Sequence, residues 1–410
     1  MSDPHGSSTG WRREAAAGRP GAQVTGGDRS TTRTLAALIL LGIANHSVLT
    51  GSRVIVSLDA LSMGASPFTV GMLMALYALL PMLLSVAAGR VSDRIGYRWP
   101  MRIGSGLIAT GAILPIAFPG FIALFASAPL VGVGFMAFQL AAQSATGEVG
   151  GLKRRTRNFT LLALGFSVSG FIGPLVAGFA IDHFGFRAAF AVFALIPLIP
   201  ITALSGRRFE LPTRPPHAAT THHGGVLALL RHRTLRRVFA VNALLSMSWD
   251  LHSIFVPIYG ERIGLSASEI GLLLSSFAAA TFAVRFFMGR ISRRLTEHQV
   301  LTGALLLGGA VFLVYPLSTS MLGLLALSFT LGLGLGSSQP MVLSLLHTHA
   351  PPGRVGEAAG VRLSLVNAMS VGVPLALGAV GASVGIGPVF WSVGTCLVTC
   401  GFVANRNGPR

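Results

Sequence analysis

The stretch GRVSDRIGYR, residues 89–98, separates two long apolar segments of the chain. One apolar segment covers residues 68–88, and the next begins near residue 100. Gly89 lets two helices approach closely, and Gly96 permits a tight turn. Asp93 suits the partial positive charge of a helix N-terminus, whereas Arg94 and Arg98 suit lipid headgroups. The stretch therefore predicts a polar loop between two membrane-spanning helices.

This loop resembles the connection between helices 2 and 3 of the major facilitator superfamily, whose pattern is G-x-x-x-D-R/K-x-G-R/K-R/K. The matching residues are Gly89, Asp93, Arg94, Gly96 and Arg98. Tyr97 departs from the pattern, because a basic residue is usual there. The resemblance implies that Asp93 docks near Gly356 and Glu357, at the start of the eleventh helix. The alternative interpretation is an ordinary basic loop after an apolar helix.

The composition places the chain in the membrane. Of its 410 residues, 52% are hydrophobic and 11% are charged, and the mean hydropathy is +0.68. Soluble domains carry about 25% charged residues. A net charge of +18 would suggest a nucleic-acid partner in a soluble protein. Here the basic residues gather in the connections between apolar segments, so the composition predicts a multi-span protein in a lipid bilayer and no nucleic-acid partner.

Twelve apolar segments are each close to the ~20 residues that a helix needs to cross the hydrocarbon layer. They cover residues 34–57, 68–90, 100–118, 121–146, 158–181, 187–206, 236–259, 268–290, 299–317, 321–346, 356–382 and 386–404. The expected fold is an all-α integral membrane protein with two pseudo-symmetric six-helix bundles, 34–206 and 236–404. Residues 1–33 are expected to form a disordered tail, 207–235 a linker with a basic amphipathic segment, and 405–410 a second tail.

The distribution of basic residues predicts the orientation. With twelve spans, 26 of the 31 Lys and Arg residues fall in the tails and in the connections on their side. The opposite side receives Arg53, Arg187 and Arg262. The positive-inside rule therefore places both termini in the cytoplasm, with the protein in the inner (plasma) membrane.

The chain repeats itself with an offset of 200 residues. Gly71 recurs as Gly271, and the motif with Pro174 recurs at Pro374. The same offset appears in three separated stretches, which chance similarity between apolar helices rarely produces. The two halves are therefore predicted to be parallel repeats, related by an axis along the membrane normal, with the substrate path between them. The resemblance to the major facilitator superfamily then covers nearly the whole chain.

A second motif lies on the fifth helix. Gly170, Gly173, Pro174 and Gly178 resemble, with looser spacing, the G-x-x-x-G-P-x-x-G-G motif of proton-coupled exporters. The resemblance implies export. The alternative is a packing helix with a proline kink. Ala128 stands where those exporters usually have an arginine on helix 4, which is a departure from standard proton antiport.

Polar residues inside the spans mark the expected pathway, because hydrocarbon penalises them and they turn inward. They are Asn45 and His46 on helix 1, Gln139 and Gln143 on helix 4, Asn242, Ser246 and Asp250 on helix 7, and Gln339 on helix 10. In the superfamily these four helices line the cavity. Asp250, near the midplane, is the candidate proton carrier. The alternative role for Asp250 is a hydrogen bond to a neighbouring helix or to the substrate.

Two arginines within spans, Arg285 on helix 8 and Arg362 on helix 11, allow two interpretations. Both lie roughly 8–10 Å from the cytoplasmic ends of their helices. They can form a pair that attracts anions at the mouth of the cavity. Alternatively, both side chains extend to the headgroups, with Arg362 paired to Glu357.

No phosphate-binding loop, nucleophile constellation or metal-ligand spacing occurs in the sequence, so we predict neither an enzyme nor a cofactor or metal site. Cys396 and Cys400 are interpreted as packing residues. The prediction is a monomeric secondary transporter that exports a small organic molecule, in exchange for protons. Import of an organic anion is the first alternative, and a membrane sensor that transports nothing is the second.

Overall fold

The computed structural model describes residues 25–151, 154–206, 211, 231–350 and 355–406. Over these ranges it consists of helices without strands, as the sequence predicts. In chain order they are α1 (Thr25–Ser62), α2 (Pro67–Ile95), α3 (Arg98–Ala117), α4 (Phe121–Glu148), α5 (Arg155–Leu195), α6 (Leu198–Ser205), α8 (Arg233–Arg262), α9 (Ala267–Ile291), α10 (Glu297–Val314), the short 3-10 helix η2 (Tyr315–Leu317), α11 (Met321–His349), α12 (Val355–Val384) and α13 (Ile386–Arg406).

The described helices form eleven runs that are long and apolar enough to cross a membrane, and one of these runs is long enough to cross twice. The run Arg157–Ser205 has 49 residues, or roughly 74 Å as one helix, against ~30 Å of hydrocarbon. Gly185 interrupts it with φ 79° and ψ 172°, a conformation that glycine adopts without a steric penalty. The chain therefore makes twelve crossings, so the start of α1 and the end of α13 lie on one side, which we call the termini side. The opposite side is called the far side.

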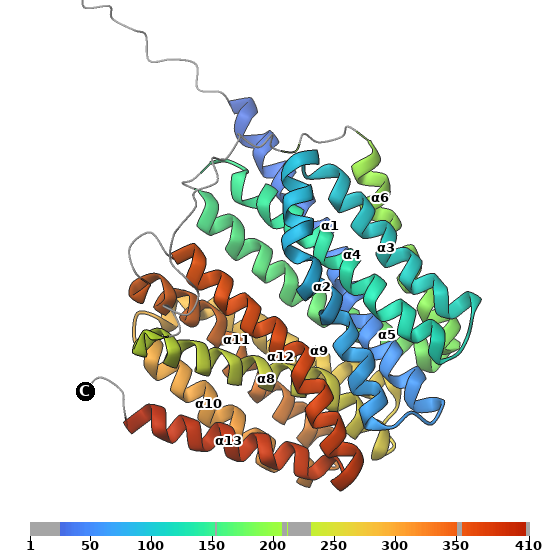
Figure 1. Ribbon diagram of the computed structural model, residues 1–410, viewed down its shortest axis with the longest axis vertical. Helices are drawn as coiled ribbons and strands as arrows, with labels where there is room; N and C mark the ends of the chain where they lie inside the picture. Colours follow the sequence, from blue (N-terminus) through green and yellow to red (C-terminus); the bar gives the residue numbers. More distant parts are fainter. Residues whose placement is uncertain (1–24, 152–153, 207–210, 212–230, 351–354, 407–410) are drawn as a thin grey trace, which may run out of the picture.

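The crossings form two bundles of six, coloured blue to green and yellow to red in Figure 1. In the first bundle α3 packs on α4 and α1 packs on α5. In the second bundle α10 packs on α13 and α9 packs on α11. The bundles contact each other mainly through α5 with α9 and through α2 with α12. This arrangement confirms the predicted fold class.

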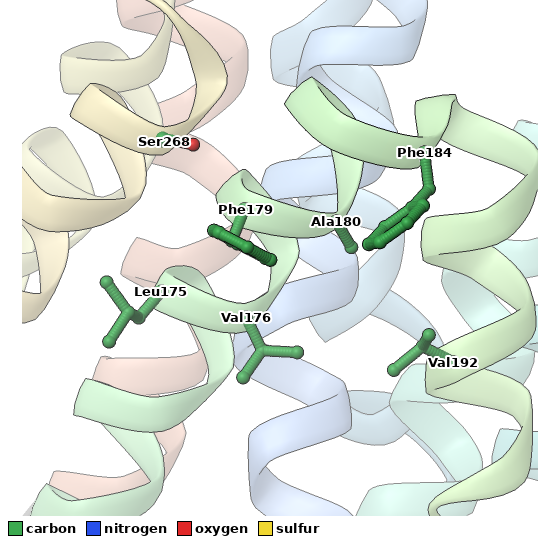
Figure 2. Close-up of a pocket in the computed structure, with 7 residues that line it drawn as sticks. All are labelled: Leu175, Val176, Phe179, Ala180, Phe184, Val192 and Ser268. Carbon is green, nitrogen blue, oxygen red and sulfur yellow. The ribbon is translucent and has the colours of Figure 1, made fainter.

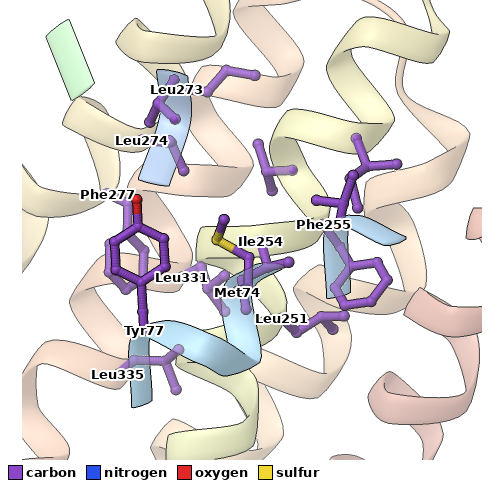
Figure 3. Close-up of a cluster of buried hydrophobic side chains, with 14 of the residues drawn as sticks. Met74, Tyr77, Leu251, Ile254, Phe255, Leu273, Leu274, Phe277, Leu331 and Leu335 are labelled. Atoms are coloured by element: carbon purple, nitrogen blue, oxygen red, sulfur yellow. The ribbon is translucent and has the colours of Figure 1, made fainter. Parts of the chain in front are cut away.

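Buried apolar side chains continue from one bundle into the other. Met74 and Tyr77 of α2 lie in the same cluster as Leu251 and Phe255 of α8 (Figure 3). All four side chains are at most 3% exposed. Lipid tails are as apolar as these side chains, so close packing, more than the hydrophobic effect, stabilises the contact.

The bundles are joined most closely on the far side. There Gly178 of α5 lies against the backbone of Ala267 in α9, and Gly378 of α12 lies against the backbone of Pro67 in α2. Toward the termini side, the described parts of α4 and α11, and of α5 and α12, make little or no contact. The structure is therefore closed on the far side, and the bundles diverge toward the termini side.

The first helix differs from its expected bounds. Helix α1 begins at Thr25 and ends at Ser62, whereas residues 34–57 were expected to form the span. Arg53, which was counted on the far side, therefore lies well before the far-side end of the helix. Residues 1–24, 207–210 and 212–230, which include most of the expected tail and linker, lie outside the described residues.

Candidate functional site

Asp250 is buried on α8 where the two bundles meet. It lies roughly 25 Å along the helix from Arg233, and its exposed fraction is 7%. Its Oδ2 atom accepts a 2.9 Å hydrogen bond from the Ser370 hydroxyl of α12. The guanidinium group of Arg53, on α1, interacts with it electrostatically from the first bundle. The carboxyl group thus has a hydrogen-bond donor in its own bundle and is influenced by a positive charge in the other.

Arg53 is a candidate site residue that the sequence analysis counted among the basic residues of the far side. Its guanidinium carbon lies 5.5 Å from the centroid of the Tyr77 ring on α2, a cation–π contact. Its Nε atom is buried and has no hydrogen-bond acceptor in the described part of the chain. The sequence did contain a signal, because apolar residues continue after Arg53 up to Leu61, as they do within a helix.

Arg285, on α9, connects three helices across the bundle interface. Its Nη1 atom donates to the Ser167 hydroxyl at 2.9 Å and to the Ala163 carbonyl at 3.3 Å, both on α5. Nη2 donates to Gln339 Oε1 at 3.2 Å, and Nε donates to the Gly336 carbonyl at 3.4 Å, both on α11. All four acceptors are neutral. The structure thus brings together the predicted residues Arg285 and Gln339.

The direction of the Arg285 side chain decides between the two interpretations of this residue. Its Cα atom lies about 9 Å from the termini-side end of α9. Ser167 and Gly336 lie roughly 18 Å and 20 Å from the termini-side ends of their own helices. The guanidinium group therefore extends inward, not toward the headgroups. It also lies 6.0 Å from the centroid of the Trp249 ring.

Arg362 of α12 and Asn242 of α8 form a second pair near the termini side. Nη1 of Arg362 donates to Asn242 Oδ1 at 3.4 Å. The Nε atom of Arg362 and the Nδ2 atom of Asn242 are buried, and neither has an acceptor among the described residues. The pair therefore presents a positive charge and two donors at one place.

His46 of α1 packs against α5 inside the first bundle. Its Nδ1 atom forms a hydrogen bond with the Ser169 hydroxyl on α5, and its ring lies 4.8 Å from that of Phe166, measured between centroids. Arg53 and Arg285 both interact with it electrostatically. The hydrogen bond and ring contacts of His46 lie within the first bundle, and its place in the solute or proton pathway stays a prediction.

Asn45 points elsewhere, although it was predicted beside His46. It is fully buried, and its Nδ2 atom donates 2.8 Å to Ser105 on α3 of the same bundle. Adjacent helical residues point about 100° apart, so they do not share a face. This corrects the predicted pathway position of Asn45. Three other predicted residues, Gln139, Gln143 and Ser246, are half-buried and make no side-chain hydrogen bond to described residues.

The loop at residues 89–98 is described in part. Gly96 adopts a φ of 79°, as the predicted tight turn requires. Arg98 donates 2.8 Å to the carbonyl of Gly206 at the end of α6, so it binds a helix terminus and not only lipid. The predicted residues whose side chains lie outside the described part are Gly89, Asp93, Arg94 and Glu357. The docking of Asp93 on the eleventh helix stays a prediction.

The glycine motif of α5 faces two different helices. Gly173 packs on α1 within the first bundle, where a side chain would collide with Thr50. Gly170, Pro174 and Gly178 face α9 of the second bundle. Small residues let the two backbones approach, so three of the four motif residues lie at an interface that must change when the bundles move.

An apolar pocket of about 460 Å³ lies beside this interface (Figure 2). Its lining residues are Leu175, Val176, Phe179, Ala180, Phe184, Val192 and Ser268. Phe179 and Phe184 are 52% and 69% exposed, as expected for side chains that face lipid. None of the polar residues around Asp250 lines it, so we do not assign the solute site to this pocket.

Within the described residues, no group of three or more His, Cys, Asp or Glu side chains could hold a metal ion. Cys396 and Cys400 are free thiols on α13.

Residues 34–373 match the family described as Major Facilitator Superfamily. The chain is 27% identical over 325 residues to the class G tetracycline resistance protein of Vibrio anguillarum, covering 74% of this chain and 78% of that one. It is 24% identical over 342 residues to a multi-drug resistance efflux pump of Streptococcus pneumoniae, covering 80% and 84%. A crystal structure of the peptide transporter POT in complex with sulfate has a TM-score of 0.76 at 17% identity, covering 93% and 97%, and shows the shared fold.

Proposed function

The chain belongs to the major facilitator superfamily, and we propose that it exports a small organic solute in exchange for protons. Membership makes the protein a secondary transporter and not an enzyme. Its two parallel repeats are expected to rock about a site between them, as such repeats do. The observation that carries the proton-exchange proposal is the position of Asp250 between a partner in its own bundle and a partner in the other.

The two partners of Asp250 respond differently to rocking. Ser370 belongs to the same bundle, so its hydrogen bond moves with Asp250. Arg53 belongs to the other bundle, so the distance between guanidinium and carboxylate changes when the bundles move. An ionised acid in this position is costly without a partner. The carboxyl group can therefore exchange its guanidinium neighbour for a proton in the alternate conformation.

Two observations favour export. The matched relatives named above are a tetracycline resistance protein and a multi-drug efflux pump. The exporter-like glycine motif of α5 also lies at the bundle interface. Import of an organic anion is the alternative, favoured by the inward direction of Arg285. The excess of basic residues on the termini side supports a cytoplasmic location for both termini in the plasma membrane.

The test uses purified protein in proteoliposomes with an imposed pH gradient. Tetracycline, ethidium and benzenesulfonate are the probes, and uptake into vesicles containing the protein in both orientations is measured. One-for-one exchange of a neutral solute for a proton gives about tenfold accumulation per pH unit, since one unit is about 1.4 kcal/mol. We expect Asp250→Asn to abolish gradient-driven accumulation while solute exchange between the two sides persists. Asp250→Glu should retain part of the coupling.

Asp59→Asn is the matched control, because Asp59 lies near the far-side end of α1 and its carboxylate has no described hydrogen bond. It should behave as the unmodified protein. Full gradient-driven accumulation in Asp250→Asn would remove Asp250 from the coupling mechanism. Vesicles that transport no probe under any gradient would instead favour the non-transporting sensor.

A further inference from the structure

The charges at the bundle interface do not balance. Arg53, Arg285 and Arg362 each bring a guanidinium group to this region. The acid described there is Asp250, and Arg53 interacts with it. Neither Arg285 nor Arg362 has an acidic partner within the described residues, although charged groups inside a membrane usually pair. The interface thus carries an excess of positive charge toward the termini side.

Buried hydrogen-bond donors also outnumber acceptors in this region. Buried Nε atoms of Arg53 and Arg362 and the buried Nδ2 atom of Asn242 lack an acceptor among the described residues. Buried donors are nearly always paired in folded proteins. A carboxylate or sulfonate supplies several acceptor sites and one negative charge, and it can bind a guanidinium in a bidentate manner. One such group beside Arg362 and Asn242 would supply acceptors for their two unpaired donors and would offset part of the positive charge.

We propose that the transported solute is a small organic acid, whose acidic group binds Arg285 and Arg362 while its apolar part lies near Trp249. This deepens the proposed function and rests on it. Trp249 is half-buried, lies 6.0 Å from the Arg285 guanidinium, and meets Phe277 edge-on at 4.7 Å. The site therefore places an aromatic surface beside a positive charge.

The position of the two arginines fits loading from the termini side. Arg285 and Arg362 lie about 9 Å and 10 Å from the termini-side ends of their helices, and the bundles diverge in that direction. Clustered charges of one sign raise the local concentration of the opposite ion. An organic anion entering there meets Arg362 and Arg285 before it reaches the Asp250 and Arg53 pair deeper in the membrane.

The test measures binding without a membrane or a gradient, so its outcome is independent of whether protons drive transport. Purified protein in a neutral detergent is titrated with benzenesulfonate, benzenesulfonamide and phenyltrimethylammonium, which share a ring and differ in charge. Binding is read as a rise in Tm. We expect the anion to stabilise the protein, and the neutral and cationic probes to do so at least tenfold more weakly. The preference should weaken at high salt.

Variants locate the effect. Arg285→Gln and Arg362→Gln should each weaken the benzenesulfonate response at least tenfold, whereas Arg285→Lys should keep the preference for the anion at lower affinity. Arg406→Gln is the control, because it removes an exposed arginine at the end of α13. If Arg285→Gln does not fold, Arg362→Gln decides. Equal responses to the three probes, including no response, overturn the proposal, as does an anion preference that survives in the Gln variants.

Discussion

The contact between α5 and α9 and the contact between α2 and α12 occupy equivalent places in the two repeats, and they share the same backbone geometry. Gly271 of α9 lies against the carbonyl of Pro174, and Gly71 of α2 lies against the carbonyl of Pro374. At both positions a Cβ atom would collide with that oxygen. The 200-residue repeat therefore gives two equivalent places where the helix backbones of the two bundles are in close contact.

The polar groups at the two contacts differ. The first four N–H groups of a helix lack partners within the helix. At α9, Ser266 and Glu269 bind each other's amides in a capping box. The remaining amides, of Ala267 and Ser268, donate 3.0 Å and 2.7 Å to the Asp182 carboxylate of the other bundle. The amides of Ala267 and Ser268 are thus paired only when the bundles are together on the far side.

The start of α2 has fewer amides that need such a partner. Pro67 stands at the position equivalent to Ala267 and has no N–H to satisfy. Thr69 finds its acceptor in the nearby Ser66 hydroxyl. The residue of α12 that is equivalent to Asp182 is Ala382, so α12 offers no carboxylate to the start of α2. The α2 contact can therefore open without leaving a capped amide unpaired.

The difference extends into the membrane. The buried Ser275 hydroxyl of α9 donates 2.7 Å to the Phe171 carbonyl of α5, and its equivalent on α2 is Ala75. The equivalent of Arg285 is Ser85, which bonds within its own helix. Among the described residues, no hydrogen bond joins α2 to α12. The two contacts thus share their backbone packing, but separating the bundles breaks hydrogen bonds between α5 and α9 and none between α2 and α12 among the described residues.

The largest expected effect tests the shared geometry. Gly71→Val and Gly271→Val should shift the protein toward the form that is open on the far side, because the added side chain forces the backbones apart. Overpacking of about 2 kcal/mol corresponds to roughly 25-fold in population. Spin labels at the exposed residues Phe118 and Leu317, after replacement of both cysteines, report the far-side distance.

Gly106→Val and Gly303→Val serve as controls, because nothing lies near a Cβ atom at either position. They should leave the distance distribution unchanged. A large shift in Gly271→Val with none in Gly71→Val would show that the two contacts differ in packing as well as in polarity.

A smaller effect tests the polar difference. Asp182→Ala removes the acceptor of two amides at the start of α9, and loss of an N-cap acceptor costs about 1 kcal/mol. The far-side-open population should rise roughly fivefold in the same spin-label measurement. The reverse substitution, Ala382→Asp, should stabilise the closed form by less than half as much, since Pro67 offers no donor. Equal and opposite effects would mean that the missing proline N–H is unimportant.

The smallest effect concerns the buried hydroxyl. Hydrogen bonds between membrane helices average about 0.6 kcal/mol, so Ser275→Ala should raise the open population roughly two- to threefold. Ala75→Ser places a hydroxyl at the equivalent position on α2 and should change the population less. A shift in Ser275→Ala as large as that of Asp182→Ala would place the main polar contact within the membrane and not at the far-side end.

The sequence identified many residues of the candidate site, but it did not predict which of them contact each other. Asp250, His46, Arg285 and Arg362 were recognised, because polar residues in an apolar span are conspicuous. Their partners were not. Ser370 and Ser167 are ordinary residues in their own segments, and they matter only because another helix brings a charged group within hydrogen-bonding distance.

Two assignments failed for reasons of helix length and rotation. Arg53 was counted on the far side because it lay near the end of the expected span 34–57, whereas α1 runs to Ser62. Asn45 was assigned to the pathway because it shares a depth with His46, although its direction differs by about 100°. Periodicity constrains relative directions within one helix. It does not state which of them faces the other bundle.

The sequence by itself determined the twelve crossings, the two repeats and the family. It could do so because hydrocarbon leaves the backbone no partner outside its own helix, so every span must be a continuous apolar helix of similar length. The tertiary structure decided which polar groups interact: Arg285 with α5 and α11, Asp182 with the start of α9, and Asp250 with Ser370 and with the charge of Arg53. These pairings depend on the rotation and separation of helices distant in the chain, which the packing of small residues between the bundles sets.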